Sequence, residues 1–297
     1  MYDRVLVPTD GSEHAVRAAE HATHLAGLFD ATVHLVHVVD LSRAAGPFDA
    51  GGVDEAFLDR LEAEGERTIA DNEDSIDAPG EVQTSILDGN PVDEILEYAA
   101  DHDIELLAMG THGRTGVKRA VAGSVTERVV RLADVPVLTV RNTERSGVRG
   151  EYEEVLVPTD GSDYAEAAVD HAIAIAEAAG ARIHALNVVD LGDLAVTPEY
   201  SPPPDVIERL ESRGEDTAER VADRARSVGL DAVTHVQEGL PARDILEYVD
   251  EHDVDFVGMG TAGRTGLTRY LLGSTTERVV RHAEVPVLTV NARNATQ

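Results

Sequence analysis

The sequence contains no cysteine, and it lacks the long apolar segments that enter membranes. Without cysteine the chain cannot form the disulfides that support many small secreted domains. No run of 18 apolar residues is present to span a bilayer, and no basic segment followed by an apolar one opens the chain, as it would in a secretory signal. We therefore expect a cytoplasmic protein that does not enter membranes.

Positive charge is also scarce. The chain has 25 Lys and Arg against 56 Asp and Glu, a formal net charge of −31, and Lys118 is its single lysine. This charge repels a phosphate backbone and argues against general nucleic-acid binding. The scattered acidic excess is typical of surfaces adapted to high salt, where carboxylates hold hydration water. We hypothesise a halophilic source, which full stability and solubility at low salt would contradict.

What the sequence does contain is a repeat with an offset of 150 residues. VLVPTDGS at residues 5–12 recurs at residues 155–162, and GSVTERVV from Gly123 matches GSTTERVV from Gly273. On this alignment the register does not slip, even across the least similar middle stretch. A period this long indicates a duplicated domain rather than a solenoid unit.

Each copy alternates short β-branched runs with longer helical patterns, which predicts an α/β fold. We expect two tandem open parallel sheets of five strands, with helices on both faces and strand order 3-2-1-4-5. In the first copy the strands are predicted near residues 4–8, 32–39, 81–87, 106–110 and 135–141. Ser12 and Ser162 stand where helix N-caps are expected. In such sheets ligands bind beyond the carboxyl ends of the strands, at the topological switch.

The polar, glycine-containing stretch after the first copy predicts an interdomain linker. The expected organisation is a first domain at residues 1–144, a linker at 145–152 and a second domain at 153–297.

The loop after the fourth strand carries the pattern G-x-x-G-x9-G-S, starting at Gly110 in the first copy and at Gly260 in the second. Glycine lets a phosphate approach the main chain, and the helix N-terminus that follows supplies unpaired N–H groups and a positive dipole end. Ser124 and Thr126 would add hydroxyl donors. The pattern predicts a phosphate-binding loop. The alternative is that the glycines only turn the chain and Ser124 only caps a helix.

On these motifs the chain resembles the universal stress protein (UspA) family, specifically its ATP-binding branch in tandem two-domain form, over essentially its whole length. The resemblance implies a Rossmann-like, adenine nucleotide alpha hydrolase-like fold and ATP as the ligand, with Mg or Mn carried by the phosphates. It also implies that an aspartate after the first strand and the main chain at the end of the second receive adenine and ribose. Residues of the fourth-strand loop hold the phosphates. The residues so assigned are Pro8, Thr9, Asp10, Val38, Met109, Gly110, Gly113, Arg114, Gly123, Ser124, Val125 and Thr126 in the first copy, and Pro158, Thr159, Asp160, Val188, Met259, Gly260, Gly263, Arg264, Gly273, Ser274, Thr275 and Thr276 in the second.

Several of these assignments have alternatives. Asp10 and Asp160 lie in Thr-Asp-Gly-Ser, which is good turn chemistry before a helix, so each could be a capping acceptor only. Arg114 and Arg264 could neutralise phosphate or stay solvated. The second copy has Thr275 where the first has Val125, and we expect both sites to be competent.

Other site types are disfavoured. His14, His21 and His24 could share one helix face and bind a metal, but the second copy keeps only His171, so we interpret them as surface or packing residues. Neither copy contains a Walker motif, and no base, nucleophile or paired carboxylate site is defined by spacing.

These patterns favour an ATP-binding stress-response module that regulates through binding; the alternative is a slow Mg-dependent ATPase or another adenine-nucleotide-handling enzyme. A structural module with vestigial sites is disfavoured because both copies keep their glycines. Residues 44–52 and 198–204 could act as nucleotide lids. Duplication also favours intramolecular pairing of the domains through the strands that begin near Val135 and Val285, or a homodimer of the tandem chain, beside unknown protein partners.

Overall fold

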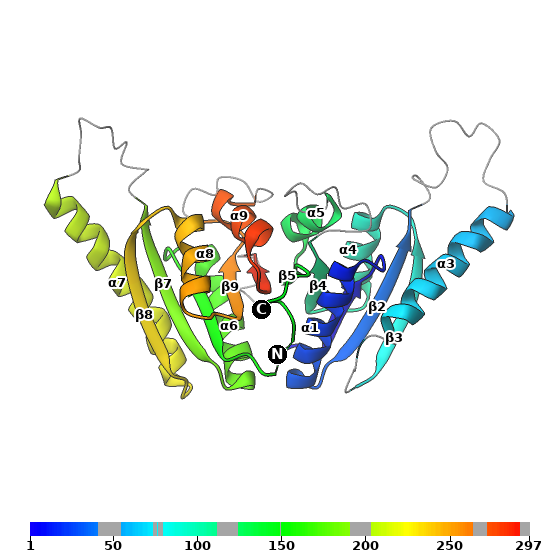
Figure 1. Ribbon diagram of the computed structural model, residues 1–297, viewed down its shortest axis with the longest axis horizontal. Helices are drawn as coiled ribbons and strands as arrows, with labels where there is room; N and C mark the ends of the chain where they lie inside the picture. Colours follow the sequence, from blue (N-terminus) through cyan, green and yellow to red (C-terminus); the bar gives the residue numbers. More distant parts are fainter. Residues whose placement is uncertain are drawn as a thin grey trace. The chain divides into compact units, whose positions relative to one another are not determined.

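A computed structural model describes residues 1–40, 55–73, 76, 80–111, 124–148, 150–190, 203–263 and 272–291. The chain divides into two compact units, Met1–Val148 and Arg149–Gln297. Each unit is an α/β fold built on a parallel sheet (Figure 1), so the predicted fold class is confirmed. The division falls inside the predicted linker, whose exact bounds stay a prediction. Within the ranges described, no helix is long and apolar enough to cross a bilayer.

Unit 1 pairs its described strands in parallel, in the order β3-β2-β1-β4-β5. Because parallel crossovers are right-handed, α1 and α3 cover one face of the sheet and α4 and α5 cover the other. The strands are β1 (Arg4–Pro8), β2 (Thr32–Val39), β3 (Val82–Asp88), β4 (Leu106–Gly110) and β5 (Val137–Val140), and the helices are α1 (Glu13–Phe29), α3 (Glu55–Glu73), α4 (Pro91–Asp101) and α5 (Ser124–Leu132).

Unit 2 repeats this arrangement, with its strands in the order β8-β7-β6-β9-β10. Helices α6 and α7 cover one face of this sheet, and α8 and α9 cover the other. The strands are β6 (Glu154–Pro158), β7 (Arg182–Asp190), β8 (Ala232–Gly239), β9 (Phe256–Gly260) and β10 (Val287–Val290), and the helices are α6 (Asp163–Ala179), α7 (Pro204–Ser227), α8 (Pro241–Glu251) and α9 (Ser274–His282).

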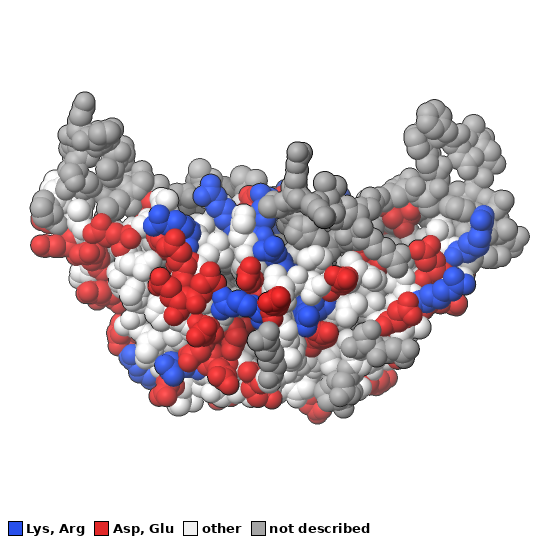
Figure 2. All heavy atoms as spheres, in the orientation of Figure 1, with Lys and Arg blue, Asp and Glu red and all other residues white. Residues whose placement is uncertain are grey.

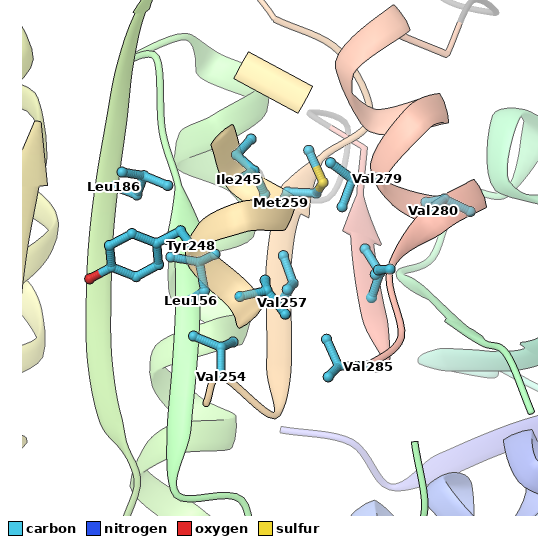
Figure 3. Close-up of a cluster of buried hydrophobic side chains, with 13 residues drawn as sticks. Leu156, Leu186, Ile245, Tyr248, Val254, Val257, Met259, Val279, Val280 and Val285 are labelled. Atoms are coloured by element: carbon cyan, nitrogen blue, oxygen red, sulfur yellow. The ribbon is translucent and has the colours of Figure 1, made fainter. Parts of the chain in front are cut away.

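Apolar side chains from both layers fix the helices of unit 2 on their sheet. Figure 3 shows Ile245 from α8 and Val279 from α9 pointing toward Leu156 and Val257 of the strands. These four side chains are almost completely buried. Burying an aliphatic side chain of this size contributes about 1.5–3 kcal/mol. The cluster therefore holds the N-termini of α8 and α9 at the carboxyl ends of the strands.

Both helices that follow the first strand of a unit begin at a serine cap. The Ser12 hydroxyl accepts the Ala15 N–H at 3.2 Å, and the Ser162 hydroxyl accepts the Ala165 N–H at 3.3 Å. The predicted N-caps are confirmed. They fix the point at which the chain turns from strand to helix above the sheet.

The two copies are not related by one constant offset. Strand positions differ by 150 residues, as in His37 of β2 and Asn187 of β7, but α3 and α7 differ by 149. A Cβ added to Gly65 would lie 3.0 Å from His37 Cδ2, and one added to Gly214 would lie 2.5 Å from Asn187 Oδ1, so these glycines are equivalent. The expectation that the register never slips was wrong. The segment before the helix is one residue shorter in the second copy, and the segment after it is one residue longer.

The polar segment after β5 lies against helix α1. The Asn142 N–H donates to His14 Nδ1 at 2.9 Å, and His21 Nε2 is 2.7 Å from the Ser146 carbonyl oxygen, to which it donates. Among the residues that the structure describes, no group of three His, Cys, Asp or Glu could hold a metal ion. His14 and His21 both contact the chain segment that follows β5 and hold it on α1.

The buried His21 predicts a pH dependence of stability. Burial lowers the pKa of this imidazole to about 4, whereas the unfolded chain takes up the proton near pH 6.5. Between these values the unfolded state binds more protons, so acidification favours unfolding. The free energy of unfolding should fall by about 2 kcal/mol through this group between pH 7 and pH 5.

We expect His21→Gln to remove this part of the pH dependence, measured by urea denaturation of the full chain at both pH values. His282→Gln changes an exposed histidine of α9 and is the control, which should keep the wild-type dependence. A His21→Gln chain as acid-sensitive as the wild type would refute the assignment.

Candidate functional site

Unit 2 contains a cavity of about 260 Å³ at the carboxyl ends of β6, β7 and β9. From β6 the sheet extends to β7 on one side and to β9 on the other, which makes this edge the topological switch. The cavity is lined by Pro158, Thr159, Asp160, Ala165, Leu186, Asn187, Val188, Val189, Asp190, Leu210, Arg213, Gly214, Pro241, Ile245, Met259, Gly260, Ala262, Gly263, Gly273, Ser274, Thr275 and Thr276. Every site residue predicted for the second copy lies here except Arg264, which is outside the described residues.

The carboxylate of Asp160 has two distinct environments. Its Oδ1 accepts the Ser162 N–H at 3.0 Å, which is the capping role expected of a turn aspartate. Its Oδ2 lies 2.7 Å from the place where a Cβ of Gly263 would stand. The missing side chain at Gly263 therefore leaves space for this oxygen at the cavity.

The loop after β9 ends at a helix N-terminus without a side-chain cap. Gly273 is the N-cap residue of α9, and its own N–H donates to the Thr261 carbonyl at 2.8 Å. The first-turn N–H groups of a helix have no partner within the helix, and their positive dipole end favours an anion. Because Ser274, Thr275 and Thr276 all line the cavity, this terminus is suited to a phosphate group.

The hydroxyl of Thr276 has a structural partner. It donates to the Gly260 carbonyl at 2.8 Å, as Thr126 donates to Gly110 at 2.7 Å. The sequence predicted Thr126 as a hydroxyl donor to phosphate. In this structure that hydrogen is used inside the protein, and the main-chain N–H is the group left for a ligand.

The first glycine of the motif is required by packing. A Cβ added to Gly260 would meet the main chain of α6, clashing with the Tyr164 carbonyl oxygen and lying 2.9 Å from Ala165 N. In unit 1 a Cβ added to Gly110 would lie 2.8 Å from Ala15 N. In each unit this strand approaches the helix that follows the first strand so closely that only glycine fits, whatever the loop binds.

The described part of unit 1 repeats this geometry. Asp10 Oδ1 accepts the Ser12 N–H at 3.1 Å, and Val38 lies at the end of β2. Pro8 ends β1 as Pro158 ends β6, and Met109 is the last residue but one of β4 as Met259 is of β9. Thr9 and Val125 are likewise among the described residues. The predicted residues that lie outside the described part of the chain are Gly113, Arg114, Gly123, the side chain of Ser124, and the lid segments 44–52 and 198–202.

Several lining residues were missed from the sequence. Asn187 Nδ2 donates to the Thr159 carbonyl at 2.7 Å, and in unit 1 His37 Nδ1 contacts the Thr9 carbonyl at 2.8 Å. The same position thus ties the end of the second strand to the turn after the first in both copies. The different residue types hid this common role. The lining residues of α7 and α8 were also missed.

The surface around the units is strongly acidic. Figure 2 shows Asp and Glu side chains spread over the visible face, with basic side chains between them. An anionic ligand therefore approaches against the net charge of −31. Local positive groups, such as the N-terminus of α9, have to compensate for this field.

Comparisons with known proteins agree with this architecture. The description of the universal stress protein family matches residues 1–141 and again residues 151–291. The chain is 38% identical to universal stress protein MJ0531 of Methanocaldococcus jannaschii over 139 residues, covering 47% of this chain and 82% of that protein. It is 29% identical to a universal stress protein of Mycolicibacterium smegmatis, covering 97% of each. The crystal structure of a universal stress protein from Archaeoglobus fulgidus is 22% identical and shares the fold, with a TM-score of 0.69 over 97% of this chain and 96% of that one.

Proposed function

The chain belongs to the universal stress protein family, and on that premise we propose that each unit binds ATP at the carboxyl ends of its strands and acts through binding. The observation that supports this proposal is the cavity of unit 2, which is lined both by Asp160 and by the N-terminus of α9, a terminus without a side-chain cap. The first is an acceptor for a hydroxyl or amino group, and the second is a site for phosphate.

The lining favours one orientation of the proposed nucleotide. The end formed by Gly263, Gly273 and the first turn of α9 suits the phosphates. The end formed by Asp160 and Val188 suits ribose and adenine, as the family resemblance implies. Mg²⁺ or Mn²⁺ would enter with the phosphates, whose charge it partly neutralises.

Regulation by occupancy would follow from contact of a phosphate with both Gly263 and α9. A bound phosphate would connect α9 with the loop after β9, so binding would favour one arrangement of this edge. We propose that this arrangement is what protein partners of a cytoplasmic stress response recognise. Pairing of the two units through β5 and β10, a homodimer of the chain and a halophilic source also stay proposals.

The direct test is the nucleotide content of the purified chain. The protein is isolated in high salt and denatured, and the released nucleotide is identified by chromatography and quantified per chain. We expect two ATP per chain. ADP or AMP in their place would favour the slow ATPase over the binding module. No released nucleotide, together with no binding of ATP by calorimetric titration, would contradict the proposal.

A further inference from the structure

The helix that lines one side of the cavity carries opposite charges at one lining position in the two copies. In unit 2, α7 contributes Leu210, Arg213 and Gly214 to the lining. With the offset of 149 residues between α7 and α3, the equivalent residues in unit 1 are Leu61, Glu64 and Gly65. An arginine in one copy therefore corresponds to a glutamate in the other, between a leucine and a glycine that are unchanged.

The hydrogen bonds inside the helices support this equivalence. The Thr217 hydroxyl donates to the Arg213 carbonyl at 2.8 Å, and the Thr68 hydroxyl donates to the Glu64 carbonyl at 2.9 Å. The following glycine packs on position 187 of β7 in one case and on position 37 of β2 in the other. Glu64 thus occupies in α3 the place that Arg213 occupies in α7.

A second reversal lies two turns further along the same helix. Arg220 corresponds to Asp71, and Arg220 Nη2 lies 3.3 Å from the place where a Cβ of Gly161 would stand. Gly161 directly follows Asp160 in the turn after β6. Helix α7 therefore has one arginine in the lining of the cavity and a second against the adjoining turn, at positions where α3 has acidic residues.

The other arginines of α7 are neutralised within the protein. Arg209 pairs with Asp205, Arg224 with Glu166 and Asp170, and Arg226 with Glu219 and Asp223. No described carboxylate lies within salt-bridge distance of Arg213 or Arg220. In so acidic a protein, two arginines left to face the same turn and cavity are available to an anionic ligand.

We propose that Arg213, which lies beside the ribose and adenine end of the cavity, acts on the phosphates through its charge at a distance, so that the unit 2 site favours a nucleoside polyphosphate over the uncharged nucleoside, and that Glu64 opposes this selectivity in unit 1. This inference rests on the proposed nucleotide binding. The two sites then differ in ligand preference although their turns and glycines are the same. Because Arg213 is exposed, the effect falls with rising salt.

The test is charge reversal at each wall position, measured by titration calorimetry of the full chain with ATP and with adenosine at low and high salt. Asp10→Asn provides the background in which the unit 2 site is measured. In that background, Arg213→Glu should weaken the binding of ATP about tenfold at low salt and leave the affinity for adenosine unchanged. The Asp160→Asn background serves to measure the unit 1 site. In it, Glu64→Arg should strengthen the binding of ATP by a similar factor.

Arg209→Glu is the matched control, because it makes the same charge change on α7 at a residue that does not line the cavity. Far-ultraviolet circular dichroism checks that each variant is folded. The inference would be overturned if Arg209→Glu and Arg213→Glu weakened the binding of ATP equally. It would also be overturned if Arg213→Glu left the ratio of ATP affinity to adenosine affinity unchanged. A wild-type chain that binds neither ligand would instead refute the proposed function.

Discussion

Replacing Gly260 by alanine is expected to destabilise unit 2 by about 3 kcal/mol, more than a hundredfold in its folding equilibrium. The added methyl group would lie against main-chain atoms of Tyr164 and Ala165 at the start of α6. Main chain cannot rotate away as a side chain can, so β9 and α6 would have to separate. The contacts of α6 with β6 and β9 would weaken together.

The measurement is urea denaturation of the full chain, followed by circular dichroism. Gly263→Ala is the control in the same loop, because its Cβ would meet only the carboxylate of Asp160, which can move. This control should retain stability. If Gly260→Ala unfolds at the wild-type urea concentration, the close approach of strand and helix is not rigid and the packing argument fails.

Asp160→Asn is expected to weaken ATP binding at unit 2 about thirtyfold while leaving the fold intact. The asparagine oxygen can still accept the Ser162 N–H, so the turn keeps its cap. The second position becomes an NH2 group, which donates and cannot accept a hydrogen bond from ribose or adenine. Losing a hydrogen bond to a charged acceptor costs about 1.5–3 kcal/mol.

Calorimetric titration with ATP measures this effect. Asp163→Asn makes the same charge change at an exposed residue three positions away and should bind ATP as the wild type does. The double variant Asp10→Asn with Asp160→Asn should purify without nucleotide. Unchanged affinity in Asp160→Asn would mean that this aspartate serves only the turn.

The sequence predicts the sheet well because its strands are defined by local composition. The run Arg4–Pro8 is β-branched and apolar, and β1 has these bounds. The predicted strand at residues 81–87 lies one residue from β3, and the expected run at 135–141 contains β5. Buried parallel strands need continuous apolar runs, so the signal lies in consecutive residues.

The cavity-lining residues of α7 could not be predicted in the same way. Helix α7 is mostly polar, and the alignment at 150 residues hides its similarity to α3. The string LEAEG at residues 61–65 and the string LESRG at 210–214 carried the signal, but only at an offset of 149. Arg213 therefore did not stand out as a site residue.

The packing role of Gly260 could not be predicted from the sequence either. Its position in a phosphate-loop motif predicts contact with a ligand, whereas its nearest constraint is the main chain at Tyr164, almost a hundred residues earlier. A steric conflict between distant segments leaves no local pattern. Both roles require glycine, so the residue type alone cannot separate them.

The one-residue difference in offset limits how the two halves of this chain could exchange parts. Neighbouring positions on an α-helix are rotated by about 100°. If α3 replaced α7 at the constant offset of 150, Glu64 would stand at position 214, against Asn187, where even a Cβ has no space. The helix would face the sheet with its charged side. Recombination between the copies is therefore compatible with the fold only when its junctions lie outside this helix and its flanking segments.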